Sequence, residues 1–261
     1  MIRAVFFDID GTLLPHQWNS MPEDTVQALR ALQAQGIMAV VSTGRNMQEF
    51  QKLTVSSFPF DGYLTLNGQL CMDRNREYFA GTPISPVEMD VLVGIFEAGR
   101  IPFLLIGRDG RYINYVDQLV VDVQGKTNGT IPTTGRYSGE EIFQICAYVD
   151  EHQKSLLDGF LDECDVTAWH EHGIDIIPKG GGKDRGIALF CEKYGIDQSE
   201  TMAFGDAPND ISMLHYCAIG VAMGNATQDV KAAADYVTDD CKSGGIANAL
   251  YALGVLKPDS I

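Results

Sequence analysis

A short, unbroken run of apolar residues that ends in two acids places the strongest constraint on this chain. Residues 4–7 (Ala-Val-Phe-Phe) lack the alternation of a half-exposed strand, and Asp8, Asp10 and Gly11 follow directly. Such a run, ended by a turn signal, is typical of a strand buried on both faces of a parallel sheet. Asp8 then lies at the carboxyl end of the strand, where open α/β sheets bind ligands. Taken alone, the Asp-x-Asp-Gly pattern fits a solvated turn equally well.

The same pattern recurs along the chain, with helical patterns between the strands. Residues 37–41 run into Ser42–Arg45, a hydroxyl pair followed by Gly and Arg, and residues 201–205 run into Asp206–Asp210. Buried strands that alternate with amphipathic helices predict an α/β fold with a doubly wound, Rossmann-like parallel sheet. Because the carboxyl ends of parallel strands share one edge of the sheet, we expect these polar residues to meet in one crevice.

The middle of the chain follows another pattern. Between residues 83 and 180 strand-like and helical segments, including a helix predicted over residues 151–163, no longer follow the parallel rhythm. We therefore expect an inserted α+β domain, mostly antiparallel, at residues 83–180. It interrupts a parallel-sheet core domain made of residues 1–82 and 181–261.

The charge balance argues against several classes of partner. The chain has 35 acids and 19 bases, a formal net charge of -16, whereas nucleic acids and anionic membranes are bound by clustered Lys and Arg. No apolar run approaches the ~20 residues of a membrane helix, and the N-terminus does not resemble a signal peptide. The six cysteines form no CxxC pair and lie mostly in apolar segments, which indicates reduced thiols in a cytoplasmic protein.

Carboxylates gathered at one edge of a sheet repel one another unless a cation lies between them or one binds a proton. Asp8, Asp10, Asp206 and Asp210 offer only hard oxygen ligands, and no His or Cys accompanies them. Mg2+ fits such a set better than Zn2+. Beside them, Ser42–Arg45 offers hydroxyl and backbone N–H donors for a phosphate. Taken alone, that stretch is explained slightly better by an N-capping hydroxyl and a solvated Arg.

Four motifs together resemble, in order and spacing, those of the haloacid dehalogenase-like phosphatase superfamily. They are Asp8–Thr12, Ser42–Arg45, Lys183 and Gly205–Asp210. The insert, Asn67-Gly68 and the segments 220–226 and 234–237 look like the Cof-type branch with a large C2-type cap (subfamily IIB). The resemblance covers nearly the whole chain. A small departure is Ala207, where relatives often carry Ser or Gly.

The resemblance implies a Mg2+-dependent phosphatase that hydrolyses small phosphorylated metabolites, sugar phosphates first among them, through an aspartyl-phosphate. Asp8 would be the nucleophile, and Asp10 would protonate the leaving group and then take a proton from water. The metal would be bound by the Asp8 carboxylate, the Asp10 backbone carbonyl, Asp206 and Asp210. The residues expected to bind the phosphoryl oxygens are Ser42, Thr43, Gly44, Arg45, Lys183 and Asn209.

Two alternatives concern the lysine and the reaction. Lys179 competes with Lys183 for the same role, but Lys183 heads the helix that returns to the core and aligns with the family lysine. A phosphomutase would use the same aspartyl-phosphate, and a non-catalytic scaffold would keep only the fold. A scaffold has no reason to keep mutually repelling carboxylates, so we favour an enzyme.

Substrate choice is expected to lie in the insert, because phosphate and metal contacts are shared by every substrate. Trp169 and Asp175 are the candidates there, an aromatic platform and a polar group of the kind that binds sugar hydroxyls. On extended strands they share a face if no bulge intervenes. A purely structural role, in which Trp169 packs in the core of the insert, explains the presence of this residue nearly as well. The sequence leaves the oligomeric state open.

Overall fold

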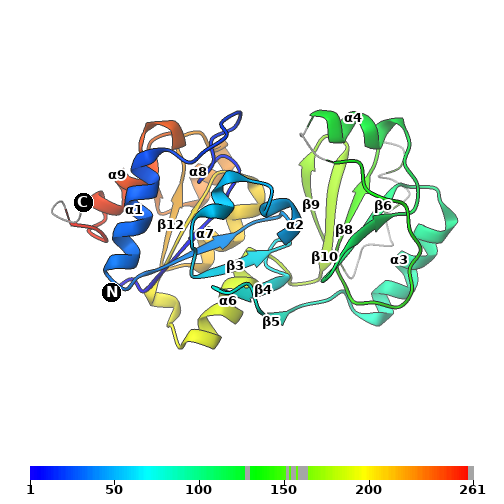
Figure 1. The fold of residues 1–261 in the computed structure, drawn as a ribbon, viewed down its shortest axis with the longest axis horizontal. Coiled ribbons are helices and arrows are strands. Elements are labelled where there is room, and N and C mark those ends of the chain that lie inside the picture. The colour runs from blue at the N-terminus through cyan, green and yellow to red at the C-terminus, as the bar shows by residue number, and fades with distance from the viewer. Residues whose placement is uncertain (127–129, 151–152, 154–156, 158–163, 258–261) are drawn as a thin grey trace. The chain divides into compact units, whose positions relative to one another are not determined.

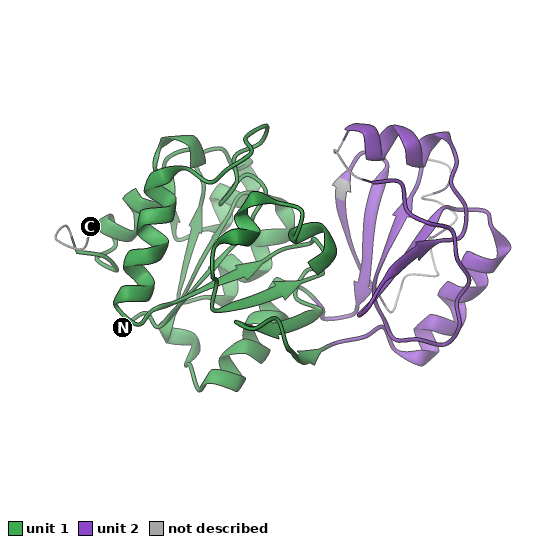
Figure 2. Ribbon diagram, viewed as in Figure 1, with its two compact units in different colours: residues 1–81, 182–261 green, residues 82–181 purple. Residues whose placement is uncertain are grey.

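The computed structural model describes residues 1–126, 130–150, 153, 157 and 164–257. The chain divides into two compact units, which Figure 2 colours separately. We call Met1–Gly81 with Gly182–Ile261 the core unit, and Thr82–Gly181 the insert. The core unit contains a mainly parallel sheet flanked by helices, so the predicted α/β fold class with an inserted α+β unit is confirmed.

The core sheet has β1 near its centre, and its strands run parallel from β13 to β3. The antiparallel hairpin β4–β5 forms the edge beyond β3. In sheet order the strands are β13 (Tyr236–Val237), β12 (Ile219–Ala222), β11 (Thr201–Gly205), β1 (Ala4–Phe7), β2 (Met38–Ser42), β3 (Gly62–Thr65), β4 (Leu70–Asp73) and β5 (Tyr78–Gly81).

Strand β1 is buried on both faces, as its unbroken apolar run predicts. Phe6 packs edge-on against Phe190 of a helix, with ring centroids 5.6 Å apart. Phe7 points to the opposite face and stacks on Phe204 of β11 at 5.2 Å. The central strand is thus clamped by aromatic side chains, which places the residues that follow it accurately.

Helices cover the two faces of the core sheet. Helices α1 and α9 contact each other on one side, and α6, α7 and α8 form a second group (Figure 1). The helices of the core unit are α1 (Glu23–Ala34), α2 (Met47–Phe50), α6 (Lys183–Tyr194), α7 (Ile211–Tyr216), α8 (Gln228–Ala233) and α9 (Gly245–Ala252), with short 3-10 turns at Thr54–Ser57, Gln198–Glu200, Pro208–Asp210 and Cys241–Ser243.

The insert has its own antiparallel sheet and its own apolar core. Its strand order is β7 (Arg111–Ile113), β6 (Phe103–Gly107), β8 (Ile142–Tyr148), β10 (Gly173–Pro178) and β9 (Cys164–His170). Helix α3 (Pro86–Ala98) begins with a capping box of Ser85 and Glu88 and packs into that core, and α4 (Gln118–Lys126) follows β7. The helix predicted over residues 151–163 lies almost wholly outside the described residues.

All six cysteines are buried, and none of them forms a disulfide. Burial raises the pKa of the Cys217 thiol to about 12, so it stays protonated and packs as a small apolar group. Among the helices that the structure describes, none combines the length and the hydrophobicity that a membrane crossing requires.

Candidate active site

The site begins in a closed turn at the carboxyl end of β1. Asp8 continues the ladder, because its N–H donates to the Phe204 carbonyl at 3.0 Å. The turn closes where the Gly11 N–H donates to the Leu14 carbonyl at 2.9 Å. Gly11 has φ of +87°, and a Cβ there would lie 2.2 Å from Oδ2 of Asp206. Only glycine lets the first turn approach the next strand end so closely.

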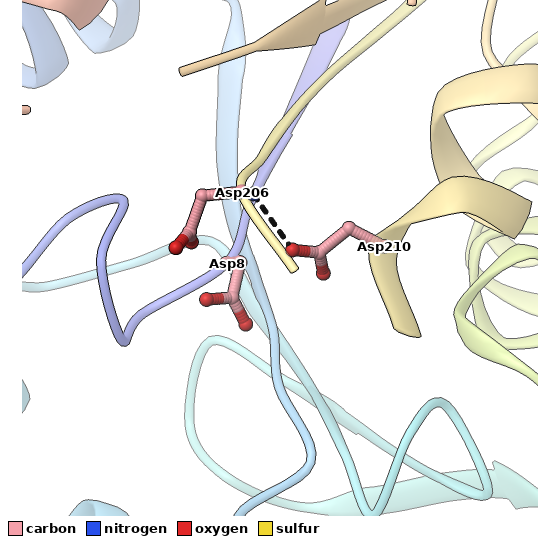
Figure 3. Close-up of side chains that lie close together, drawn as sticks. All are labelled: Asp8, Asp206 and Asp210. Atoms are coloured by element: carbon pink, nitrogen blue, oxygen red, sulfur yellow. Dashed lines mark hydrogen bonds between the residues drawn. The ribbon is translucent and has the colours of Figure 1, made fainter. Parts of the chain in front are cut away.

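The second part of the site follows β11, the parallel neighbour of β1. Asp210 folds back over the strand end, and its Oδ2 accepts the N–H groups of Asp206 and Ala207, both at 2.9 Å. Figure 3 shows the first of these bonds and the carboxylates of Asp8 and Asp206 lying near each other. The 3-10 turn Pro208–Asp210 therefore brings the Asp210 carboxylate to the strand end, where it also holds the backbone of Asp206 in place.

Asp8, Asp206 and Asp210 form the candidate metal centre. One carboxylate oxygen of each lies within 4.8 Å of the others, and all three side chains are buried (Figure 3). Asp10 does not belong to this cluster. Its predicted metal contact was the backbone carbonyl, and that contact stays a prediction.

Lys183 enters this cluster from the start of α6. Its Nζ lies 2.6 Å from Oδ1 of Asp8 and 2.5 Å from Oδ1 of Asp210, and the side chain is fully buried. The competing Lys179 is exposed and belongs to the insert. The structure therefore brings Lys183, the preferred lysine, to the acids.

Burial and mutual repulsion shift the pKa values of these groups. Burial raises the pKa of Asp8 well above its ordinary value, and Lys183 offsets part of that rise. Burial, followed by the Asp210 charge, raises the pKa of Asp206 to about 7. Burial alone would lower the pKa of Lys183, but the carboxylates of Asp210 and Asp8 outweigh it and raise that pKa. Three buried acids with one buried lysine leave an excess of negative charge that suits a cation.

The stretch after β2 carries the predicted phosphate-binding residues. Ser42 and Thr43 are buried, and Oγ of Ser42 has no hydrogen-bond partner in the described part of the chain. Oγ1 of Thr43 accepts the N–H of Arg45 at 3.1 Å. The Arg45 guanidinium forms two hydrogen bonds with Asp10, which raise its own pKa. Phosphate binding by Ser42, Thr43, Gly44 and Arg45 stays a prediction.

Asn67 is a site residue to which the sequence analysis assigned no role. Its Oδ1 accepts an N–H from the side chain of Asn209 at 3.1 Å, and its backbone N–H donates to the Thr43 carbonyl at 2.9 Å. Leu66 and Asn67 both have left-handed backbones, with φ of 55° and 53°. Such φ values are uncommon outside glycine and often occur at functional sites. A Cβ on Gly44 would lie 3.1 Å from Oδ1 of Asn67, so the two loops touch.

Thr12 and Asn225 were also missed, and both support Asp206. Oγ1 of Thr12 donates to Oδ1 of Asp206 at 2.9 Å. Nδ2 of Asn225 donates to the Gly11 carbonyl at 2.8 Å and contacts Oδ2 of Asp206 at 3.4 Å. Both residues follow the ends of parallel strands, β1 and β12, and that position is the signal that would have identified them.

In the insert, Asp175 is buried and its Oδ1 accepts from the Sγ of Cys146 at 2.9 Å. Asp175 lies opposite Thr167 of β9. The pairing of the two strands then shifts register between Gly173 and Ile174, beside Trp169. A bulge does intervene, so alternation no longer implies that Trp169 and Asp175 share a face. The side chain of Trp169 lies outside the described part of the structure.

Comparison with known proteins gives one consistent picture. A sequence profile of the haloacid dehalogenase-like hydrolases matches residues 5–250. YkrA of Bacillus subtilis is 32% identical over 98% of this chain and 99% of its own. The solved phosphatase BT1666 of Bacteroides thetaiotaomicron superposes with a TM-score of 0.89 at 30% identity, covering 98% of this chain and 96% of its own. The subclass IIB sugar phosphatase BT4131 superposes with a TM-score of 0.83 at 32% identity, covering 97% of this chain and 100% of its own. With the acids and the lysine at the ends of β1 and β11 and at the start of α6, the chain belongs to the haloacid dehalogenase-like hydrolase family and is a phosphatase of the Cof type.

Proposed function

We propose that the protein is a Mg2+-dependent phosphatase that hydrolyses sugar phosphates through an aspartyl-phosphate at Asp8. The observation that carries the proposal is the buried contact of Asp8 with Lys183 beside Asp206 and Asp210. A carboxylate at a strand end, with a lysine on one oxygen and further acids within reach, combines a nucleophile with the means to offset the charge of an incoming phosphate.

The residues present fit a hard divalent cation. The cluster offers only carboxylate oxygens, and burial, followed by the Asp210 charge, raises the pKa of Asp206 to about 7. Such a donor set suits Mg2+ and not a soft metal. Asp8, Asp206 and Asp210 would hold the ion. When bound, it supplies charge neutralisation at the phosphoryl oxygens and at the nucleophile.

Asp8 carries the first half of the reaction. The charge of Lys183, 2.6 Å away, favours the ionised form that burial disfavours. One carboxylate oxygen of Asp8 attacks phosphorus, and the bond from phosphorus to the ester oxygen breaks. Lys183 also holds Asp210 and so keeps the nucleophile and the end of β11 in one arrangement. Positioning and charge stabilisation account for most of the catalysis of phosphoryl transfer.

Asp10 acts as general acid in the first half-reaction and as general base in the second. It gives a proton to the departing oxygen, and the resulting carboxylate then takes a proton from the water that attacks phosphorus. The bond from phosphorus to Asp8 breaks, which releases inorganic phosphate and restores both carboxyl groups. Asp10 lies in the closed turn that follows Asp8, which supports this role.

Sugar phosphates are proposed as substrates because the sugar phosphatase BT4131 matches nearly the full length of the chain. We propose that the insert, at about residues 83–180, selects the leaving group, with Trp169 and Asp175 as its candidate contacts. The six free cysteines support a cytoplasmic location for the enzyme.

The test is Asp8→Asn, which preserves the size of the side chain and removes the nucleophile. We expect no turnover of a panel of sugar phosphates with Mg2+, although circular dichroism shows a folded protein. In the wild type, borohydride added during turnover should reduce the acyl phosphate and leave homoserine at position 8, detected by peptide mass. Residual activity of Asp8→Asn within tenfold of the wild type contradicts the assignment. Conversion of glucose 1-phosphate to the 6-phosphate without free phosphate identifies a phosphomutase instead.

A further inference from the structure

The Arg45 guanidinium donates two hydrogen bonds to the Asp10 carboxylate. Its Nε donates to Oδ2 of Asp10 at 2.6 Å, and its Nη2 donates to Oδ1 at 2.8 Å. This fork arrangement uses both carboxylate oxygens and specifies the orientation of the carboxylate plane. In the described part of the chain, no other side chain hydrogen-bonds to the Asp10 carboxylate.

Both partners of this pair are held by their backbones. The N–H of Arg45 donates to Oγ1 of Thr43 at 3.1 Å, and its carbonyl accepts the N–H of Leu66 at 3.1 Å. The next residue, Asn46, caps helix α2 by accepting the N–H of Glu49 at 2.9 Å. Asp10 lies in the closed turn after β1. The pair therefore connects two rigid strand ends.

The side chains of Arg45 and Asp10 are 31% and 39% exposed. Ion pairs this exposed contribute little to stability, so the pair is poorly explained as a structural element. Its effect lies in orientation, because without a partner the half-exposed carboxylate would rotate among several rotamers. A misplaced catalytic group costs about 10- to 100-fold in rate.

The geometry of the pair bears on one half of the proposed reaction. Both oxygens of the Asp10 carboxylate accept from one guanidinium, so the pair presents that carboxylate in a single orientation. In the second half of the reaction, Asp10 takes a proton from the water that attacks phosphorus. In the first half, Asp10 is needed only when the leaving group requires a proton.

We propose that Arg45 is a positioning residue that holds the Asp10 carboxylate for hydrolysis of the aspartyl-phosphate, and is not a ligand of the phosphoryl group. The inference rests on the proposed function. It replaces the role that the sequence suggested for Arg45, and it separates the two half-reactions. With a substrate whose leaving group departs without a proton, loss of Arg45 should slow the second half-reaction and leave the first nearly unchanged.

The experiment is rapid-mixing kinetics of Arg45→Ala with p-nitrophenyl phosphate, whose leaving group departs without a proton. The rate constant for the first release of p-nitrophenolate should stay within about threefold of the wild type. The steady-state rate that follows should fall about 10- to 100-fold, and aspartyl-phosphate trapped by borohydride should accumulate. Free guanidinium at tens of millimolar should restore part of the steady-state rate.

Arg3→Ala is the matched control, because Arg3 is also a half-exposed arginine bonded to a carboxylate, that of Glu200 at 3.1 Å. It should leave both phases unchanged. Arg45→Gln replaces Arg45→Ala if the alanine variant does not fold.

A raised KM with a slower first phase and no accumulated intermediate would make Arg45 a phosphate ligand and overturn the inference. Equal loss in both phases, or no loss, overturns it too. If the wild type itself forms no aspartyl-phosphate, the proposed function fails first, and that result is visible without any variant.

Discussion

Asp206→Asn should make the metal-free protein more stable at neutral pH. Asp206 is only 7% exposed, and burial followed by the Asp210 charge raises its pKa from 3.8 to about 7. A carboxyl group whose pKa is raised in the folded state destabilises that state once it ionises. The penalty grows as the pH rises from about 4 and is complete above about pH 7. Asparagine has nearly the same shape and no charge, so it removes the penalty.

The size of the gain follows from two contributions. The rise of the Asp206 pKa from 3.8 to about 7 corresponds to a loss of roughly 4 kcal/mol in the free energy of unfolding above pH 7. Asparagine keeps an oxygen for the hydroxyl of Thr12 but sets its amide against Nδ2 of Asn225, which approaches Asp206 at 3.4 Å. That conflict costs about 1–2 kcal/mol. The expected net gain is about 2–3 kcal/mol, or about 4–12 °C in Tm.

The assay is thermal unfolding in EDTA, measured by calorimetry at about pH 8 and at about pH 4. Asp206→Asn should melt higher than the wild type at the upper pH. At the lower pH it should melt slightly lower, because the wild-type side chain is protonated there and only the cost of the amide contact remains. Mg2+ at 100 times its Kd should raise the free energy of unfolding of the wild type by about 3 kcal/mol and leave that of the variant almost unchanged. The exposed Glu192→Gln, which removes the same charge from the surface, is the control. A variant no more stable than the wild type at the upper pH, or an equal gain at both pH values, refutes the reasoning.

Two further predictions concern the lysine and the insert. Lys183→Met should lower the free energy of unfolding of the metal-free protein by about 3–5 kcal/mol in urea, because Asp8 and Asp210 stay buried without their cation; a loss below about 1 kcal/mol counts against this buried triad. Trp169→Ala and Asp175→Ala should change the relative kcat/KM among sugar phosphates by about tenfold or more and affect p-nitrophenyl phosphate much less. Equal losses on every substrate would assign both residues to folding.

The sequence was sufficient to predict the part of the site that depends on topology. Asp8 and Asp206 end neighbouring parallel strands, and sheet geometry alone brings such ends together. Lys183 could be preferred over Lys179 because it begins a helix that returns to the core. The placement of Asp8 and Asp206 needed only the order of strands and helices, which the apolar pattern carries, whereas the preference for Lys183 also used its alignment with the family lysine.

Side-chain partners could not be predicted in the same way. The motif spacing places Arg45 near the site but does not say whether its guanidinium meets a phosphate or Asp10. The bulge beside Trp169 is a local departure from pairing that strict alternation cannot anticipate. The position of Asn225 after β12 marks it as a site candidate, but its contact with the Asp206 carboxylate could not be read from the sequence. Each case depends on the packing of particular side chains.

The insertion point has a consequence for how the protein is made on the ribosome. Strand β1 pairs with β2 soon after synthesis, but its other neighbour, β11, emerges roughly 160 residues later. At about 5–20 residues per second, one edge of the central strand waits on the order of ten to thirty seconds for its partner. During that interval the insert, with its own sheet and apolar core, is complete and can fold. The aromatic edge of β1 is then the segment that most needs protection from aggregation in the nascent chain.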